Sequence, residues 1–193
     1  MNLPSRVPPI LYTVGHSTRS LEDFVALLKG HGVAAVADVR RFPRSRKYPH
    51  FNDDALADSL PEAGLRYAPV PALGGRRRTS ADSPNTGWRN QGFRGYADYM
   101  LTPAFEQGLA QLAALAAETP TAMMCAEAVP WRCHRSLIAD AMLVRGWQVL
   151  DIVGDAAPSP HKLTKFAKVD GTRITYPNAE VQPPAGDTPG LFD

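Results

Sequence analysis

Short apolar runs alternate along the chain with segments in which apolar residues recur at helical spacing. The runs are apolar throughout rather than at every second position, which is typical of strands that are buried on both faces. They are ILYTVG (10–15), VAAVADV (33–39), LRYAPV (65–70), TAMMCA (121–126) and WQVLDIV (147–153). The pattern therefore predicts five strands of a mostly parallel sheet that is covered by helices.

The segments between these runs carry recognisable helix ends. Ser20 stands three residues before Asp23, the arrangement in which a side chain caps the first turn of a helix, and Gly32 marks where that helix stops. The remaining predicted helices cover 53–63, a segment that opens at Thr102-Pro103, and about 133–145.

This alternation predicts an α/β fold of the Rossmann-like, doubly wound kind, with a five-stranded sheet in the order 3-2-1-4-5. KVDGTRITYP (168–177) places Asp-Gly between two short β-like runs, which predicts a C-terminal β-hairpin. Residues 1–177 are thus expected to form a single domain, followed by a flexible Pro/Gly-rich tail over 178–193.

Composition narrows the class of protein. The chain has 193 residues, 44% of them hydrophobic, which suffices for one sizeable core. Two cysteines exclude a disulfide scaffold. The apolar runs are too short to span a membrane, and MNLPSRVPPILYTVG lacks the order of a signal peptide. We therefore expect a cytoplasmic protein without a membrane partner, and the oligomeric state stays open.

Positive charge is concentrated in the middle of the chain. The net charge is only +2, but residues 40–94 contain eleven Lys/Arg and five Asp/Glu, a net of +6, so the remainder carries −4. Such a cationic segment predicts an anionic partner, either a small phosphate-bearing molecule or a nucleic acid. A solvated surface loop is the alternative.

Chemically distinctive residues follow three of the predicted strands. Ligands of open α/β sheets bind beyond the carboxyl ends of the strands where the winding reverses, here expected between the first and fourth strands. His16 follows the first strand, Asp38 ends the second, and Cys125 and Glu127 end the fourth. These residues, together with Cys133, are predicted to meet in one crevice as the candidate catalytic groups.

Each of these groups has a structural alternative. Glu127 is suited either to proton transfer or to an ion pair with Arg135 or Arg40. Asp38 and His16 likewise have either a functional or a purely structural role. Either cysteine could simply be buried. Cys133 is predicted near the start of a helix, where the N–H groups lower a thiol pKa, so we expect it to be more reactive than Cys125.

The predicted phosphate ligands are basic side chains near the same crevice: Arg40, Arg44, His134 and Arg135. A tyrosine-phosphatase-like loop is excluded, because nine residues separate Cys125 from Arg135 and only one separates Cys133 from it. No G-x-G-x-x-G follows the first strand, so no dinucleotide cofactor is expected.

Cys125, Cys133 and His134 are also candidate metal ligands. The two cysteines lack the paired C-x-x-C spacing of structural zinc sites, so no metal is predicted, although a site that also used His16 stays open in space.

Two basic loops are expected to rim the crevice. RRFPRSRKYPHFN (40–52) places Phe42, Tyr48 and Phe51 among basic residues, and the loop over 74–94 adds Trp88, Phe93 and five arginines. Basic side chains neutralise phosphates and aromatic rings stack on bases, which is the basis of a nucleic-acid-binding hypothesis. The alternative is that these aromatic residues pack on the core.

Several segments together resemble the domain of unknown function 488 family, from about residue 12 to residue 177. They are VGHSTRSLEDFVALLKGHGVAAVADVRRFPRSRKYPHFN, LGG, FRGYADYM, CAEAVPWRCHR and HKLTKFAKVDGTRITYP. The family's core motif fits Cys125, Glu127, Pro130, Cys133, His134 and Arg135. The resemblance implies a fold and a set of recurrent residues, and no reaction.

Three hypotheses follow. The first is an enzyme acting on a phosphate-bearing substrate, such as a nucleotide or nucleic acid. The second is a non-catalytic nucleic-acid-binding module in which the cysteine motif is structural. The third is a thiol or metal protein in redox chemistry.

Overall fold

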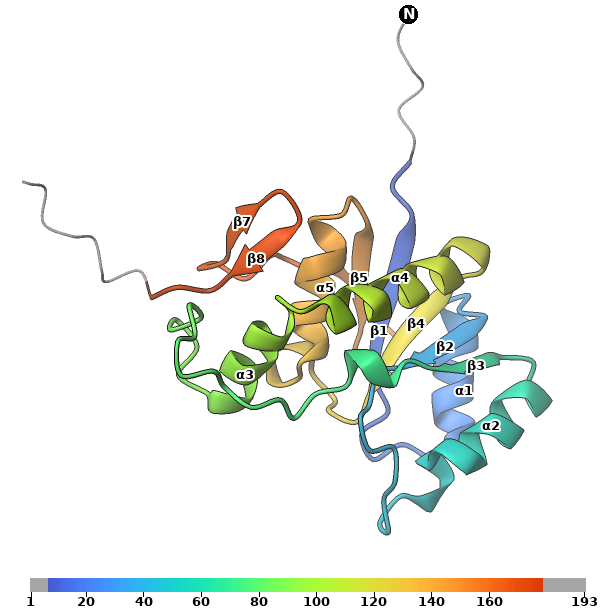
Figure 1. Cartoon of the computed structure of the whole chain (residues 1–193). Coiled ribbons are helices and arrows are strands. Elements are labelled where there is room, and N and C mark those ends of the chain that lie inside the picture. The colour runs from blue at the N-terminus through green and yellow to red at the C-terminus, as the bar shows by residue number, and fades with distance from the viewer. Residues whose placement is uncertain (1–6, 179–193) are drawn as a thin grey trace, which may run out of the picture.

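A six-stranded, mostly parallel sheet forms the centre of the protein in a computed structural model that describes residues 7–178 (Figure 1). The strand order is β3-β2-β4-β1-β5-β6, and only β6 runs antiparallel to its neighbour. The strands are β1 (Ile10–Gly15), β2 (Ala35–Asp38), β3 (Arg66–Pro69), β4 (Thr121–Cys125), β5 (Gln148–Ile152) and β6 (Ser159–Pro160).

The predicted order 3-2-1-4-5 is wrong, because β4 lies between β1 and β2. Gly15 of β1 is in register with Cys125, and Asp38 of β2 is in register with Met124. The five predicted strands do form, but a hydrophobic pattern does not specify how many strands each parallel connection crosses. The structure thus supports a mixed α/β fold and not the finer Rossmann-like order.

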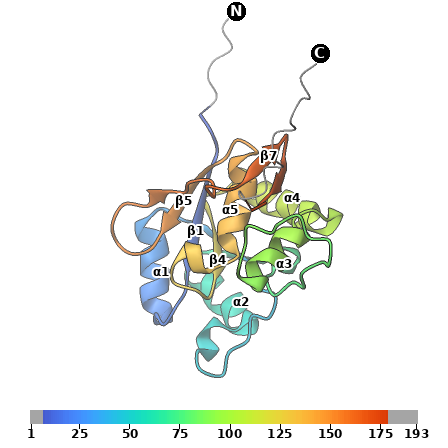
Figure 2. The same cartoon turned by 90° about the vertical axis from the view of Figure 1, so that its left-hand side faces the viewer.

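Helices cover both faces of this sheet (Figure 2). One face carries α1 (Leu21–Gly30) and α2 (Asp53–Glu62), and the other carries α3 (Gln91–Tyr99), α4 (Pro103–Glu118) and α5 (Arg135–Leu143). Alternate strand residues supply the two core layers. Ala37 and Met123 pack toward α3–α5, whereas Val36 and Met124 pack toward α1 and α2.

The helix ends follow the expected chemistry with two exceptions. The Ser20 side chain accepts a hydrogen bond from the Asp23 amide at 3.0 Å, and Gly32 adopts a positive φ of 71°. The first exception is α3, which was not predicted and begins inside the segment read as a loop, where Asn90 caps it. The second is α5, which begins at Arg135 rather than near Cys133.

The predicted C-terminal hairpin is confirmed as β7 (Lys168–Asp170) and β8 (Arg173–Thr175), with Gly171 at a positive φ in the turn. Tyr176, directly after β8, is fully buried and donates a 2.9 Å hydrogen bond to Asp140 of α5. The hairpin is therefore tied to that helix. Nearly all of the predicted tail, from residue 179 onward, lies outside the described residues. Within 7–178, no helix has the length and apolar character needed to cross a membrane.

Candidate functional site

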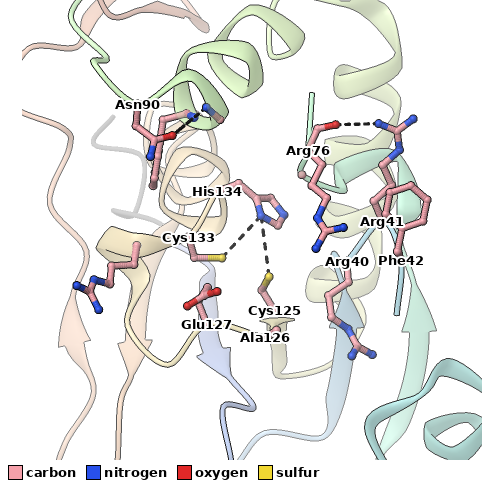
Figure 3. A pocket seen from close by; sticks show the side chains of 14 residues that line it. Arg40, Arg41, Phe42, Arg76, Asn90, Cys125, Ala126, Glu127, Cys133 and His134 are labelled. Atoms are coloured by element: carbon pink, nitrogen blue, oxygen red, sulfur yellow. Dashed lines mark hydrogen bonds between the residues drawn. The ribbon is translucent and has the colours of Figure 1, made fainter. Parts of the chain in front are cut away.

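A pocket of about 350 Å³ opens at the carboxyl edge of the sheet, beside the end of β4 (Figure 3). Its walls combine sulfur, imidazole, carboxylate and guanidinium groups with Phe42 and Phe93. The chemically distinctive lining residues are Cys125, Cys133, His134, Glu127, Arg40, Arg41, Arg76 and Arg132.

Three of these residues form what we call the Cys–His cluster: Cys125, Cys133 and His134. The His134 Nδ1 atom lies 3.9 Å from the Cys125 sulfur and 3.7 Å from the Cys133 sulfur, and both sulfurs point toward the ring (Figure 3). His134 Nε2 lies 3.0 Å from the carbonyl oxygen of Val39. Because a carbonyl can only accept, Nε2 carries the ring proton, and the free lone pair of Nδ1 faces the two sulfurs.

The pKa values of the two thiols shift in opposite directions. A hydrogen bond from the Cys133 thiol lowers the pKa of Cys125 well below its ordinary value, against the effect of burial. The same hydrogen bond, together with burial, raises the pKa of Cys133. This is opposite to the expectation that Cys133 is the more reactive thiol. Cys133 has an extended backbone ahead of α5, because Pro130–Arg132 forms a separate 3₁₀ helix, so it does not sit in the first helical turn.

Two glycines allow the backbone to close around this cluster. A side chain at Gly15 would place its Cβ 1.8 Å from the Glu127 carbonyl oxygen, so the end of β1 can lie against the loop after β4 only as glycine. A Cβ at Gly75 would lie 2.8 Å from His134 Nδ1. The loop after β3 therefore passes directly over the imidazole ring.

Arg135 does not line the pocket, so the structure gives no support to its predicted role as a phosphate ligand there. Its side chain is fully buried, and its guanidinium donates to the backbone carbonyls of Glu127 and Ala128 and to the Thr13 hydroxyl. These bonds fix the path of the loop after β4. The structural alternative for Glu127, an ion pair with Arg135, does not form, because Arg135 bonds the Glu127 carbonyl and the Glu127 carboxylate is exposed at the pocket.

The remaining predicted catalytic groups belong to a second arrangement, which we call the Asp38 network: Asp38, Arg40, Tyr67 and His16. Arg40 donates two hydrogen bonds of 2.8 and 2.6 Å to the Asp38 carboxylate, and the Tyr67 hydroxyl donates a third of 2.8 Å. His16 stacks on Phe51 with ring centroids 4.1 Å apart. Burial and the neighbouring Arg40 charge lower the pKa of His16 to about 4, which keeps it neutral near pH 7.

The three strand ends therefore share an edge but not a pocket. The predicted placement of His16, Asp38 and Glu127 at one sheet edge is confirmed by the strand register. Their predicted meeting in one crevice is wrong: Asp38 and His16 do not line the pocket that holds the Cys–His cluster. Arg40 alone among the Asp38 network contributes to that wall.

Some residues of the two basic loops also lie away from the pocket. Arg44 is 69% exposed, lies 3.4 Å from Asp53 of α2 and does not line the pocket, so its predicted role as a phosphate ligand there is not supported. Phe51 is fully buried, and Trp88 stacks on Phe93 with centroids 4.7 Å apart. Most of the aromatic residues thus pack on the core.

Phe42 is the exception among these aromatic residues. It is 61% exposed, whereas Phe93, which also lines the pocket, is half-buried. The guanidinium groups of Arg41 and Arg76 lie 5.3 and 5.9 Å from the Phe42 ring centroid. Sequence reasoning flagged both loops but did not select Arg41, Arg76 or Arg132 as site residues. The available signal was Gly74-Gly75 directly before Arg76, since paired glycines permit a close approach of the backbone.

The fold and pocket define an α/β protein with two buried thiols and a half-buried imidazole at the carboxyl edge of its sheet. The chain belongs to the family described as domain of unknown function DUF488, whose model matches residues 20–142. The resemblance seen in the sequence is thereby confirmed. Comparison with curated proteins and with solved structures found no match.

Proposed function

We propose that this protein is an enzyme that acts on a small phosphate-bearing substrate in the pocket described above. The observation that carries the proposal is that one concave site combines the Cys–His cluster with a rim of arginines. Buried thiols beside a half-buried imidazole that faces a pocket supply reactivity, and guanidinium groups select anions. The volume of about 350 Å³ is at the lower end for small-molecule sites.

The arginines differ in how free they are to bind a substrate. Arg40 is committed to Asp38 through two of its nitrogens. Arg76 and Arg132 are exposed at the rim, and Arg41 uses one nitrogen to donate to the Arg76 carbonyl at 3.0 Å. Because the guanidinium N–H groups of Arg76 and Arg132 can donate to a bound ligand, these two residues are the candidate ligands for a phosphate group.

Glu127 supplies the candidate proton-transfer group. Its carboxylate is exposed at the pocket, and its position is fixed by the bond between its own carbonyl and Arg135. The side chain is thus free to meet a substrate, while the backbone that carries it is held rigidly. Such an arrangement suits general acid–base catalysis.

Nucleic-acid binding has less support from the same residues. The hypothesis depended on aromatic side chains that stack on bases. Burial of Phe51 and the mutual packing of Trp88 and Phe93 leave Phe42 as the exposed ring of the two basic loops within the described chain. One exposed ring, with the half-buried Phe93 beside it in a compact pocket, fits a single nucleotide better than an extended strand.

Ligand binding by matched arginine variants tests the proposal. The probes are inorganic phosphate, pyrophosphate and nucleoside mono- and triphosphates, measured by calorimetry and by thermal shift at low salt. At least one probe is expected to bind, and Arg76→Ala should weaken it by roughly 10- to 100-fold, the value of a charge-assisted hydrogen bond. Arg44→Ala is the control, since it removes the same charge outside the pocket. Equal losses in both variants, or no binding by any probe, would overturn the proposal.

A further inference from the structure

The Cys–His cluster has the dimensions of a metal site. One ligand atom from each of Cys125, Cys133 and His134 lies within 4.8 Å of the other two. Tetrahedral zinc has bonds of about 2.3 Å to sulfur and about 2.0 Å to nitrogen, so a sulfur and a nitrogen ligand are separated by roughly 3.5 Å. The observed separations of 3.9 and 3.7 Å are slightly longer. Shifts of a few tenths of an ångström would complete the geometry.

The second nitrogen of His134 provides an independent observation. Histidines that bind metals almost always donate their other N–H to a carbonyl or carboxylate, which fixes the ring and its tautomer. His134 Nε2 does this with the Val39 carbonyl at 3.0 Å. The lone pair of Nδ1 is therefore held toward the two sulfurs before any metal arrives.

The donor set indicates which metal would bind. Two thiolates and one imidazole suit Zn²⁺ and other borderline or soft ions, and do not suit Mg²⁺ or Ca²⁺. Two thiolates also balance the charge of a divalent ion. All three residues line the pocket, so the fourth coordination position faces the space where a substrate would bind.

We infer that Cys125, Cys133 and His134 bind a single zinc ion, with one coordination position open to the arginine-rimmed pocket. This deepens the proposed function, on which it rests for the substrate, by naming the reactive centre. Three protein ligands with an open fourth position are the pattern of catalytic zinc, which binds and acidifies water. Glu127 lines the same pocket outside the ligand set, where it can accept a proton from that water.

The spacing rule that argued against metal applies to another kind of site. Paired C-x-x-C ligands come from one tight loop, as in structural zinc sites. Here seven residues separate the cysteines: Cys125 ends β4, whereas Cys133 follows the Pro130–Arg132 3₁₀ helix. The fold, rather than a short loop, brings the two sulfurs together.

The test is titration of the reduced, metal-free protein with Co²⁺ followed by Zn²⁺. We expect one Co²⁺ per chain, with the intense visible bands of tetrahedral cobalt and a near-ultraviolet thiolate-to-cobalt band, all displaced by one equivalent of Zn²⁺. Cys125→Ser, Cys133→Ser and His134→Ala should each weaken binding by at least roughly 100-fold. His31→Ala is the matched control, since His31 binds the Gly154 carbonyl away from the pocket.

A second measurement needs no variant and so does not depend on whether the variants fold. In the wild-type protein, one equivalent of Zn²⁺ should protect both thiols from alkylation. Three outcomes would overturn the inference. The first is that Zn²⁺ leaves the alkylation rates of both thiols unchanged, and the second is that a Cys125–Cys133 disulfide forms in place of metal binding. The third is a cobalt spectrum that His134→Ala does not change. Phosphate binding that depends on Arg76 would then leave the proposed function standing. Conversely, tight zinc binding without phosphate binding would refute the proposed substrate alone.

Discussion

The Cys–His cluster and the Asp38 network lie at the same edge of the sheet, yet they differ in how their polar groups are satisfied. In the Asp38 network the carboxylate accepts from both Arg40 and Tyr67, so its charge is neutralised inside the protein. In the Cys–His cluster His134 Nε2 is tied to the backbone, but both sulfurs face a pocket. A polar residue at a strand end becomes structural when its neighbours can satisfy it.

The separation follows from the alternation of side chains along a strand. Asp38 is in register with Met124, whose side chain packs toward α1 and α2, and Tyr67 packs against the same layer. Cys125, one residue further along β4, packs toward α3–α5. Successive residues point to opposite faces, so two polar clusters at one edge end up on different sides of the sheet.

The largest effect should come from Asp38→Ala. Removal of the carboxylate leaves the buried Arg40 charge without its partner, and breaking such a pair costs about 3–5 kcal/mol of unfolding free energy. Chemical denaturation measures this loss. Cys125→Ser is the comparison variant and should cost clearly less, because the pocket side of its sulfur is open. Equal losses would remove the distinction between the two clusters.

His161 belongs to a third polar group, whose members we expect to satisfy one another as those of the Asp38 network do. The pH dependence of the unfolding free energy tests this expectation. His161 Nε2 lies 2.8 Å from Asp140 of α5, and Nδ1 lies 3.5 Å from Asp151 of β5. Despite the opposing effect of burial, these carboxylates raise the pKa of His161 from 6.5 to about 9. Tyr176 and Thr13 also donate to these two carboxylates.

Because the folded pKa is the higher one, the stabilisation is complete below pH 6.5 and is lost as pH rises through about 9. The expected loss is about 2–3 kcal/mol. Denaturant unfolding from pH 6 to pH 10 measures it, and His161→Ala should flatten this part of the curve. An unchanged slope in that variant would contradict the assignment.

Alanine substitutions at the adjacent Gly74 and Gly75 should have smaller effects on stability, and they compare a scaffold contact with a contact to the Cys–His cluster. A Cβ at Gly74 would lie within 2.6–2.8 Å of Arg41 backbone and Cβ atoms, whereas a Cβ at Gly75 would meet the His134 ring. Gly74→Ala should therefore destabilise the fold by about 1–3 kcal/mol, as overpacking does. Gly75→Ala should cost less stability but impair cobalt binding, because the displaced part is a ligand side chain. Cobalt titration and denaturation of both variants measure this, and a reversed order would be inconsistent with the structure.

The smallest change in stability should come from Glu127→Gln. The side chain is exposed, and the bond from Arg135 is made to its backbone carbonyl, which the substitution leaves intact. Unfolding free energy should stay within about 0.5 kcal/mol of the wild type. Once a substrate is known, the rate should fall by roughly 100-fold or more. A large stability loss with unchanged activity would show that Glu127 belongs to the scaffold.

Sequence reasoning located the strands, the hairpin and the residues at the strand ends, because these depend on local patterns. β1 begins and ends where the apolar run does, and Asp-Gly marks the hairpin turn. The same reasoning did not find α3, whose residues include two glycines and several polar groups, or the order of the strands.

The role of Arg135 also lay beyond the sequence. An arginine in a Cys-His-Arg motif suggests a phosphate ligand, but its partners are carbonyls that only the folded loop presents. Likewise, the approach of Cys125 to Cys133 depends on the turn made by the Pro130–Arg132 3₁₀ helix. Long-range contacts of this kind have no local signature.

The position of β4 has a consequence for the order of events during folding. Neighbouring strands lie about 4.8 Å apart, so β1 and β2 stand roughly 10 Å from each other, separated by a strand that emerges much later in synthesis. Until β4 enters, both strands present unpaired edges, and a long loop must close before the sheet is continuous. Because Cys125 is the last residue of β4, the insertion that joins β1 to β2 also brings the first sulfur to the pocket. A chain in which β4 has not yet inserted between β1 and β2 therefore lacks the Cys–His cluster.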